Sequence, residues 1–423
     1  MSTIHINGPA RLCGEASIQG SKNAVLPMMA GALLHRGITV LTNVPLIRDV
    51  TCMSRILTFL GCKVEQNGGE LVIDARNVDQ TELSPELVSS MRSSVILLGA
   101  LLGRLGEAKS VYPGGCLIGA RPIDLHLKAL RDMGVQVEEL DETILVLAKD
   151  GVSGGRVDLS FPSVGATQQA LLAAVLAKGT TVIRNAAREP ELLYLCRFLR
   201  GMGAEIAGEG TDLLVVHGVS ALHDSVFCVP GDRIVAGTYL CAAMATRGEI
   251  TLRGISPWEL CEPLKYLSRS GAKVRRDDEA GEIQLSMKER PLGLTIETAP
   301  YPGFPTDLQS PFLAFLCTAR GESRIRETIF EDRFGVVSEL LKLSAAVCTF
   351  GREAWVWGKC SLSGSSVRAR DLRGGAALVV AALAAEGQTR IFHCGYVERG
   401  YEDICRDLQG LGADIFWEKV PKT

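Results

Sequence analysis

One short phrase recurs along the whole chain: a leucine, a glycine four residues later, and a valine or isoleucine three residues after that. Three of its copies read L-T-F-L-G-C-K-V, L-R-D-M-G-V-Q-V and L-R-G-M-G-A-E-I. The marker residues are 67 to 74 residues apart, and they are Gly61, Gly134, Gly203, Gly271, Ala345 and Gly412. Six units of nearly constant length therefore cover most of the 423 residues, which indicates internal duplication.

The phrase predicts a helix that ends at the glycine and a strand that begins after it. Glycine adopts the left-handed conformation that closes a helix, and a β-branched residue favours a strand. Ala345 is the exception, because an alanine there either bears a strained left-handed geometry or ends its helix differently. We expect this fifth copy to be the degenerate one.

A second phrase precedes each of these, and it predicts a helix that is apolar on every side. Examples are residues 25–34, 170–177 and 376–385. Such helices must be buried all round, so sheets are expected outside and helices inside. We predict an α/β fold, a two-lobed inside-out barrel of six pseudo-symmetric repeats with three in each lobe. Residues 21–230 form the first lobe, residues 1–20 and 231–423 form the second, and the active site lies in the cleft between them.

Composition excludes several classes of protein. A chain of 423 residues exceeds the roughly 250 to 300 residues of one core, and its net charge of −3 gives no basic surface for nucleic acid. The start of the chain has no apolar signal core, and the apolar runs are too short for a membrane span, so we expect a cytoplasmic protein with no membrane partner. Thirteen cysteines without C-x-x-C pairs and six scattered histidines predict reduced thiols and no metal.

Polar residues concentrate where the buried helices begin. These starts are Ser21-Lys22-Asn23, Met91-Arg92-Ser93, Ser163-Val164-Gly165, Asp232-Arg233, Thr306-Asp307 and Asp371-Leu372-Arg373. Helix capping accounts for Ser21, Ser163, Thr306 and Asp371. Capping does not account for the cations Lys22, Arg92 and Arg373, because a positive charge opposes the dipole at a helix start. We therefore expect these ends to bind several phosphates or carboxylates.

The segment from Pro113 to Pro122 reads P-G-G-C-L-I-G-A-R-P and carries one thiol among glycines. The glycines permit backbone movement, so Cys116 is a candidate nucleophile on a lid, although a single cysteine often only fills space. Arg121 in this loop, Arg333 and Arg399 add further positive charge. The chain has no Walker A loop and no G-x-G-x-x-G, so ATP and NAD chemistry are not indicated.

Several longer motifs match one enzyme family. They are S-K-N-A, P-G-G-C-L-I-G-A-R-P-I-D-L-H, P-S-V-G-A-T, N-A-A-R-E-P-E, F-P-T-D-L-Q, D-L-R-G-G-A-A-L and R-G-Y-E. From Ile6 to Ile415 the chain resembles the UDP-N-acetylglucosamine 1-carboxyvinyltransferases, which are similar in fold to shikimate-phosphate enolpyruvyl transferases. The resemblance implies transfer of the enolpyruvyl group of phosphoenolpyruvate to the 3-hydroxyl of UDP-N-acetylglucosamine. This reaction releases phosphate and is the first committed step of peptidoglycan precursor synthesis.

The resemblance also implies roles for individual residues. Cys116 is expected to be the general acid and the site of a pyruvate adduct, and Asp307 the general base, with Lys22 and Arg399 as further catalytic groups. The residues implied for phosphoenolpyruvate are Lys22, Asn23, Arg92, Arg121, Arg333, Arg373 and Arg399. The residues implied for UDP-N-acetylglucosamine are Asn23, Arg92, Arg121, Pro122, Ile123, Asp124, Leu125, Ser163, Val164, Gly165, Asp307 and Ile329. No metal and no organic cofactor are expected, and an epoxide phosphonate of the fosfomycin type should alkylate Cys116.

Two departures from the family pattern leave alternatives open. Val235 replaces an acidic residue that is usual in its motif, and Ser344-Ala345 stands where the family tends to have methionine and glycine. The alternatives are a catalytically silent protein that binds the sugar nucleotide and an enolpyruvyl transferase acting on another hydroxyl. In each case we expect small-molecule partners and a monomer or a weak homo-oligomer.

Overall fold

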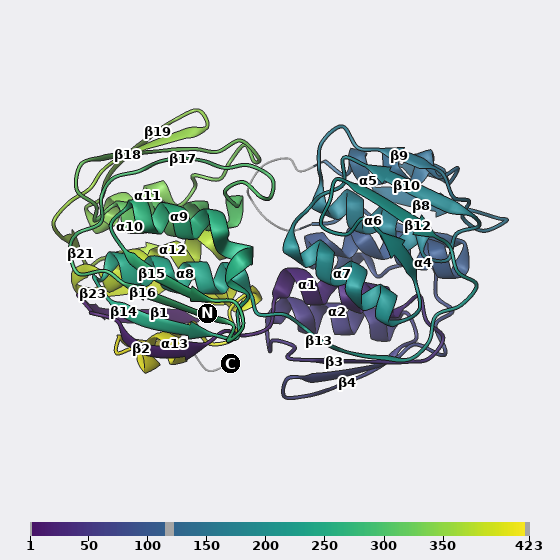
Figure 1. The fold of residues 1–423 in the computed structure, drawn as a ribbon, viewed down its shortest axis with the longest axis horizontal. Coiled ribbons are helices and arrows are strands. Elements are labelled where there is room, and N and C mark those ends of the chain that lie inside the picture. The colour runs from purple at the N-terminus through teal and green to yellow at the C-terminus, as the bar shows by residue number, and fades with distance from the viewer. Residues whose placement is uncertain (1, 115–121, 419–423) are drawn as a thin grey trace. The chain divides into compact units, whose positions relative to one another are not determined.

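Two units, each with its own hydrophobic core, make up the computed structural model, which describes residues 2–114 and 122–418 (Figure 1). Unit 1 holds residues 2–19 and 231–418, and unit 2 holds residues 20–114 and 122–230. The chain therefore begins in unit 1, passes through all of unit 2, and returns to unit 1.

Unit 2 contains three sheets and the helices that they enclose. Its sheets are β13(Ser225–Cys228)-β3(Ile38–Thr42)-β5(Glu70–Asp74)-β4(Lys63–Asn67), β11(Glu205–Ala207)-β12(Leu213–His217)-β10(Thr180–Arg184)-β9(Arg156–Asp158) and β6(Glu107–Val111)-β8(Thr143–Leu147)-β7(Gln136–Leu140). Its helices are α1(Lys22–Ala32), α2(Arg48–Phe59), α3(Pro85–Ser90), the 3-10 helix η1(Arg92–Ile96), α4(Leu97–Leu105), α5(Asp124–Asp132), α6(Val164–Ala174) and α7(Pro190–Gly201).

Unit 1 also contains three sheets. They are β21(Leu362–Ser363)-β23(Ala385–Phe392)-β1(Thr3–Gly8)-β24(Asp414–Glu418) with β22(Ser366–Arg368) beside β23, then β15(Lys273–Asp277)-β16(Glu282–Ser286)-β14(Glu249–Arg253)-β2(Cys13–Ser17), and β17(Thr295–Glu297)-β18(Glu322–Arg326)-β20(Glu353–Trp357)-β19(Ala346–Phe350). Its α-helices are α8(Arg233–Ala245), α9(Cys261–Arg269), α10(Gln309–Leu316), α11(Val337–Leu340), α12(Leu372–Leu383) and α13(Ile404–Gly410). Its 3-10 helices are η2(Pro257–Leu260), η3(Thr306–Leu308), η4(Leu341–Leu343) and η5(Cys394–Arg399).

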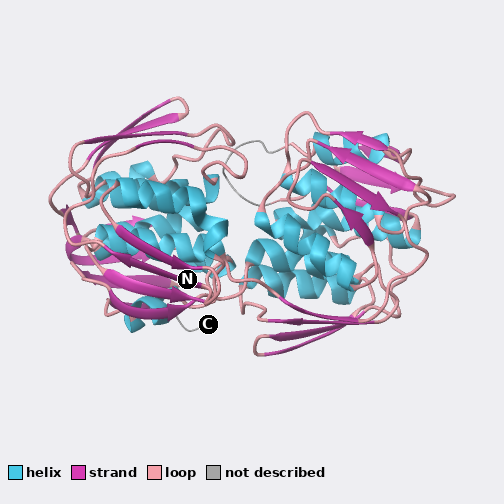
Figure 2. Ribbon diagram, in the orientation of Figure 1, coloured by secondary structure: helices cyan, strands magenta, loops and turns pink. Residues whose placement is uncertain are grey.

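The most apolar helices occupy the middle of each unit, and strands lie toward the outside (Figure 2). In unit 1, α8, α10 and α12 pack against one another and every residue of the three is buried. In unit 2, α4 packs against α1 and against α6. After their first turns, both α1 and α6 consist of buried residues. A helix without a polar face loses contact with water only when neighbours cover all its sides. The predicted α/β class is confirmed, with mixed sheets.

Five of the sheets share one pairing pattern among the described residues. In each, an edge strand runs parallel to its neighbour, which then pairs antiparallel with the next strand, as β9, β10 and β12 do. The same order holds for β13-β3-β5, β2-β14-β16, β17-β18-β20 and β22-β23-β1. The sheet β6-β8-β7 has only a single parallel bridge, from Glu82 to Lys109, in the edge position.

The six helix ends marked by the leucine–glycine phrase close with the same hydrogen bonds. Gly61 has a φ of 102°, and the next amide, of Cys62, donates to the carbonyl of Leu57. In the fifth copy, the left-handed residue is Ser344, with a φ of 64°, and the amide of Ala345 donates to Leu340. The sequence-based marker at Ala345 was therefore wrong by one residue, because a serine stands where the other copies have glycine.

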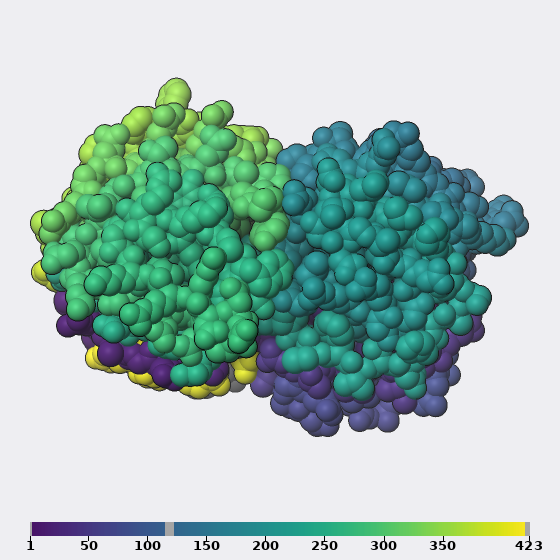
Figure 3. Space-filling view, in the orientation of Figure 1, coloured from purple at the N-terminus to yellow at the C-terminus, as the bar shows by residue number. Residues whose placement is uncertain are grey.

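The N-terminal strands belong to unit 1. β1 pairs antiparallel with β23 on one side and with β24 on the other, with Ile4 opposite Ile391 and Trp417. On the face drawn in Figure 3, purple atoms of the N-terminal residues lie beside yellow atoms of the C-terminal residues. No helix within residues 2–114 and 122–418 has the length and apolar character of a membrane span. None of the twelve described cysteines forms a disulfide.

Candidate functional site

The first basic helix start pairs Lys22 with a carboxylate that the sequence analysis missed. The Nζ atom of Lys22 lies 2.6 Å from Oδ2 of Asp49, and the two side chains are 13% and 5% exposed. Lys22 opens α1, and Asp49 lies in the first turn of α2, where a negative charge stabilises the helix start. Asp49 compensates the positive charge of Lys22, which the start of α1 alone would disfavour.

The capping predictions are right at two helices and wrong at two others. The Ser163 hydroxyl accepts the amide of Ala166, and the Asp371 carboxylate accepts the amides of Arg373 and Gly374. Ser21 and Thr306 make no capping hydrogen bond within the described chain. The helix α10 instead begins through η3, so the Thr306 hydroxyl points elsewhere and donates to Glu327.

Arg92 lies next to the start of the thiol loop. Its Nη1 atom donates to the carbonyl oxygen of Pro113 at 3.4 Å. One residue later, a Cβ on Gly114 would collide with the carbonyl oxygen of Ser89, so only glycine fits there. These contacts attach the near end of the loop to α3 and η1. Cys116 and Arg121 lie outside the described residues.

The predicted sugar-nucleotide segments of unit 2 meet at two helix starts. Ile123 is buried at the beginning of α5, with Pro122 and Asp124 exposed on either side of it and Leu125 half-buried. The starts of α5 and α6 are in contact, because the ring of His126 lies where a Cβ of Gly165 would be. Ser163, Val164 and Gly165 therefore present the amide end of α6 next to α5. Backbone amides at a helix start are suited to phosphate oxygens.

In unit 1, a carboxylate bridges two buried arginines. Oδ1 of Asp307 accepts a hydrogen bond from Nη2 of Arg333 at 2.6 Å, and Oδ2 accepts one from Nη2 of Arg373 at 2.8 Å. The arginine side chains are 3% and 4% exposed, whereas Asp307 is 28% exposed. The carboxylate thus has one side toward solvent and its two oxygens on guanidinium groups.

Electrostatics favours the charged form of Arg373. Burial by itself lowers its pKa, but the charge of Asp307, with smaller contributions from Tyr401 and Asp232, raises the pKa above its ordinary value. Arg399 ends η5, which packs on α12, and Val397 of η5 leaves no room for a Cβ on Gly375. The three predicted phosphoenolpyruvate ligands of unit 1 are therefore carried by α12 and the two segments beside it.

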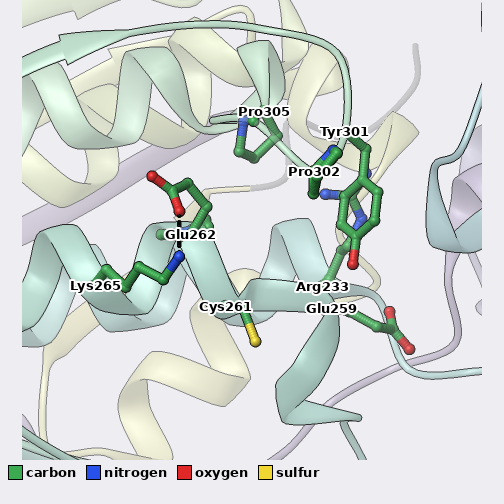
Figure 4. Close-up of a pocket in the computed structure, with 10 residues that line it drawn as sticks. Arg233, Glu259, Cys261, Glu262, Lys265, Tyr301, Pro302 and Pro305 are labelled. Carbon is green, nitrogen blue, oxygen red and sulfur yellow. Dashed lines mark hydrogen bonds and ion pairs between the residues drawn. The ribbon is translucent and has the colours of Figure 1, made fainter.

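A hollow near Arg233 is distinct from these groups (Figure 4). The guanidinium carbon of Arg233 lies 5.9 Å from the ring centre of Tyr301, and Lys265 pairs with Glu262 at 2.8 Å on the same wall. Its volume is about 70 Å³, enough for a few water molecules, which take about 30 Å³ each in liquid water, but not for a sugar nucleotide. Among the described residues, no three His, Cys, Asp or Glu side chains are placed to hold a metal ion.

The main-chain amide of Ile329 is hydrogen-bonded to Glu327. Its amide donates to Oε1 of Glu327 at 2.8 Å, so only its carbonyl group remains available as a main-chain contact for a substrate. The sequence analysis missed Glu327, which is buried and precedes the F-E-D-R-F segment.

Comparisons with known proteins decide the family. The sequence model of EPSP synthase (3-phosphoshikimate 1-carboxyvinyltransferase) matches residues 6–408. The UDP-N-acetylglucosamine 1-carboxyvinyltransferase 2 of Caldanaerobacter subterraneus subsp. tengcongensis is 44% identical over 98% of this chain and 99% of its own length. The UDP-N-acetylglucosamine 1-carboxyvinyltransferase of Finegoldia magna is 41% identical over 98% of each chain.

The chain belongs to the UDP-N-acetylglucosamine 1-carboxyvinyltransferase family. The resemblance drawn from the motifs is thereby confirmed. The crystal structure of the enolpyruvyl transferase NikO from Streptomyces tendae matches this carboxyvinyltransferase fold with a TM-score of 0.89 at 26% identity, over 99% of both chains. An EPSP synthase structure from Acinetobacter baumannii, at 19% identity and a TM-score of 0.72, shares the fold.

One departure from the carboxyvinyltransferase pattern has a simple structural setting. Val235 lies in the first turn of α8 and is fully buried, and its amide donates to the capping carboxylate of Asp232 at 3.1 Å. An apolar side chain is compatible with this fully buried position. The substitution removes none of the groups described above.

Proposed function

We propose that this protein transfers the enolpyruvyl group of phosphoenolpyruvate to the 3-hydroxyl of UDP-N-acetylglucosamine, with release of phosphate. Relatives named UDP-N-acetylglucosamine 1-carboxyvinyltransferase match nearly the full chain. The observation that carries the proposal at the level of residues is Asp307, a partly exposed carboxylate held by the buried cations Arg333 and Arg373. A candidate base beside groups that bind a phosphate is what the reaction requires.

Basic groups for the two substrates are present on both units. We propose that phosphoenolpyruvate binds to Lys22, Asn23, Arg92, Arg121, Arg333, Arg373 and Arg399. We propose that the sugar nucleotide contacts Asn23, Arg92, residues 121–125, residues 163–165, Asp307 and Ile329. Both units then contribute to one reaction, which agrees with the division of these residues between residues 21–230 and 231–423.

The chemistry proceeds as addition followed by elimination. Asp307 takes the proton of the sugar hydroxyl, whose oxygen bonds to C2 of phosphoenolpyruvate, while Cys116 gives a proton to the methylene carbon C3. In the elimination, the Cys116 thiolate takes a proton back from C3 of the tetrahedral ketal, the double bond between C2 and C3 re-forms, and the C2–O bond to phosphate breaks. The departing phosphate takes the proton held by Asp307, so both groups return to their starting forms. Guanidinium groups stabilise the leaving phosphate, and we propose that no metal or organic cofactor takes part.

The arginines around Asp307 suggest how the base is released. A carboxylate that accepts bonds from two guanidinium groups is a weak base, because both bonds favour its ionised form. Arg333 and Arg373 are among the proposed phosphoenolpyruvate ligands. Binding of that anion gives both guanidinium groups a second partner and loosens their hold on Asp307. The order of events is then phosphoenolpyruvate binding first and proton removal afterwards.

The finer architecture belongs to the same proposal. We propose that the chain arose as six copies of one helix–strand unit, three in each inside-out barrel-like lobe. The common pairing order of five sheets and the six equivalent helix ends support this. We further propose a cytoplasmic enzyme that acts as a monomer or a weak homo-oligomer, with small molecules as its partners and neither nucleic acid nor membrane.

Phosphate release from phosphoenolpyruvate, with and without UDP-N-acetylglucosamine, tests this function. The expected result is release that depends on the sugar nucleotide. A protein that binds the nucleotide without releasing phosphate would be the silent binding protein, and release with another hydroxyl substrate alone would indicate the third alternative. The variant Cys116→Asp is expected to keep part of the turnover, since a carboxylic acid also donates a proton, and to lose the pyruvate adduct seen by intact-mass measurement.

A further inference from the structure

We propose that Glu327 is a positioning residue that sets the geometry of Asp307 and of the loop bearing Ile329 and Arg333. This inference rests on the proposed function of Asp307 as a base. Glu327 follows β18 directly, is 1% exposed, and was not among the residues implied by the family motifs. Its side-chain hydrogen bonds go to Thr298, Thr306, Ile329 and Phe330.

The carboxylate of Glu327 accepts four hydrogen bonds. Oε1 accepts from the Thr298 hydroxyl at 3.0 Å and from the amides of Ile329 at 2.8 Å and Phe330 at 3.2 Å. Oε2 accepts from the Thr306 hydroxyl at 2.9 Å. Each carboxylate oxygen offers about two lone pairs, so Oε1 is fully engaged by three donors and Oε2 has one donor. Buried charges bonded in this way hold their neighbours in one arrangement.

These bonds join three segments that are separate in sequence. Thr298 follows β17, Thr306 begins η3 next to Asp307, and Ile329 opens the loop that carries Arg333. Arg333 then returns to η3, donating to Asp307 and also to the carbonyl of Thr306 at 3.4 Å. The contacts form a closed circuit of hydrogen bonds and backbone. Glu327 binds Thr306, which is next to Asp307 in the chain, Asp307 binds Arg333, and the backbone from Arg333 leads back to Glu327. A shift of Glu327 therefore moves the base and its arginine together.

The circuit has a direct chemical consequence. A general base must lie within hydrogen-bond reach of the proton it removes, and a displacement of about 1 Å costs up to about 100-fold in rate. The Ile329 amide is occupied by Glu327, which leaves the Ile329 carbonyl as the main-chain group of that residue for a ligand. Glu327 thus acts on the sugar nucleotide without touching it.

Unit 1 offers a matched control for a buried carboxylate. Glu339 on α11 is 2% exposed and accepts from the amide of Arg368 at 3.0 Å and from Nζ of Lys342 at 2.7 Å. The hydrogen-bond partners of its carboxylate in the described part of the chain are Lys342, Arg368 and Arg370, and none of them is Asp307, Arg333 or Ile329. Loss of stability alone should therefore be similar for Glu327→Gln and Glu339→Gln.

The test compares Glu327→Gln, Thr306→Val, the double variant and Glu339→Gln in the full-length protein. Glu327→Gln keeps the shape but replaces the acceptor facing Thr306, and Thr306→Val removes the same bond from the other side. We expect each to lower kcat by about 10-fold or more and to raise the Kd for UDP-N-acetylglucosamine by about threefold, with Glu339→Gln within about twofold of wild type. Because the two substitutions remove one bond, the double variant should lose little more than either single variant.

Two results would overturn the role of Glu327. One is a Glu327→Gln enzyme whose kcat and Kd match those of Glu339→Gln, and the other is a double variant whose losses are the product of the single losses. A wild-type protein that releases no phosphate would instead contradict the proposed function. The Kd comparison by calorimetry still decides the role of Glu327 in that case, since it does not depend on turnover.

Discussion

At the scale of single residues, the buried cysteines behave as apolar groups. Burial raises the pKa of the thiols of Cys62, Cys196, Cys317 and Cys394 to about 12. Each therefore stays protonated at neutral pH and is a poor nucleophile, since the thiolate is the reactive form. Alkylating reagents should therefore react with exposed thiols in preference to these four buried ones.

Cys317 gives a prediction for stability at high pH. It is fully buried at the end of α10, and its thiol donates to the carbonyl of Leu313 at 3.3 Å. In the unfolded chain the thiol ionises above about pH 9, whereas in the folded chain it ionises only near 12, so stability falls as pH rises between these values. At pH 10.5 the loss is roughly 2 kcal/mol.

The variant Cys317→Ser removes this effect because serine does not ionise. We expect the difference in unfolding free energy between wild type and Cys317→Ser to shrink by that amount from pH 8.5 to pH 10.5, measured by urea unfolding. Cys348→Ser is the matched control, since solvent reaches the Cys348 thiol in the folded protein. A constant difference for Cys317→Ser across this range would show that the thiol is already ionised in the folded state.

The position of a residue at a helix start was predicted correctly where the signal was local in sequence. Lys22, Arg92 and Arg373 stood out because cations are disfavoured at the start of a buried helix. Asp49 and Glu327 were missed, because each one finds its partners on elements distant in sequence and neither forms a motif by itself. The same limit applied to Thr306, whose residue type favours capping while a tertiary contact with Glu327 directs the side chain elsewhere.

At the scale of elements, the fifth helix end provides the clearest test. Ser344 is exposed and left-handed, whereas the buried Ala345 has an ordinary backbone conformation. We expect Ser344→Gly to stabilise the protein by about 0.5 to 1 kcal/mol, because glycine lacks the steric penalty of the left-handed region. Ala345→Gly should destabilise it by about 1 kcal/mol, since it removes a buried methyl group and adds backbone freedom.

Chemical denaturation of the two variants beside wild type measures both changes. Opposite signs are expected, and a stabilised Ala345→Gly would mean that the repeat was correctly marked at that residue after all. The periodic phrase predicted the helix ends and the apolar helices because both depend on short-range patterns. It could not distinguish Ser344 from Ala345, because a helix end without glycine leaves only tertiary structure to fix the turn.

At the scale of the whole molecule, the proposed ligands are divided between two units. Lys22, Arg92 and residues 163–165 lie in unit 2, whereas Asp307, Arg333 and Arg373 lie in unit 1. A ligand that needs both sets should change the reactivity of Cys116. We expect UDP-N-acetylglucosamine to accelerate alkylation of Cys116 by an epoxide phosphonate of the fosfomycin type. Intact-mass measurement over time gives the rate of this alkylation.

The variant Asp307→Asn separates the contributions to this acceleration. It removes a proposed sugar contact on unit 1, so alkylation should persist while the sugar nucleotide no longer speeds it. Glu339→Gln is the control and should behave as wild type. Acceleration that survives in Asp307→Asn, or an adduct on a thiol other than Cys116, would contradict the joint use of both units. The division of the chain was expected from the repeat spacing, whereas the contacts of Asp307 needed the structure.

The position of β1 in its sheet affects the order in which the two units can fold during synthesis on the ribosome. Residues 3–8 precede all of unit 2 in the chain, whereas their two neighbours in the sheet, β23 and β24, follow it. All of unit 2 has left the exit tunnel before β1 can acquire a partner strand. Unit 2 can therefore fold during synthesis, while the sheet of unit 1 that contains β1 is completed only after the residues of β23 have been added.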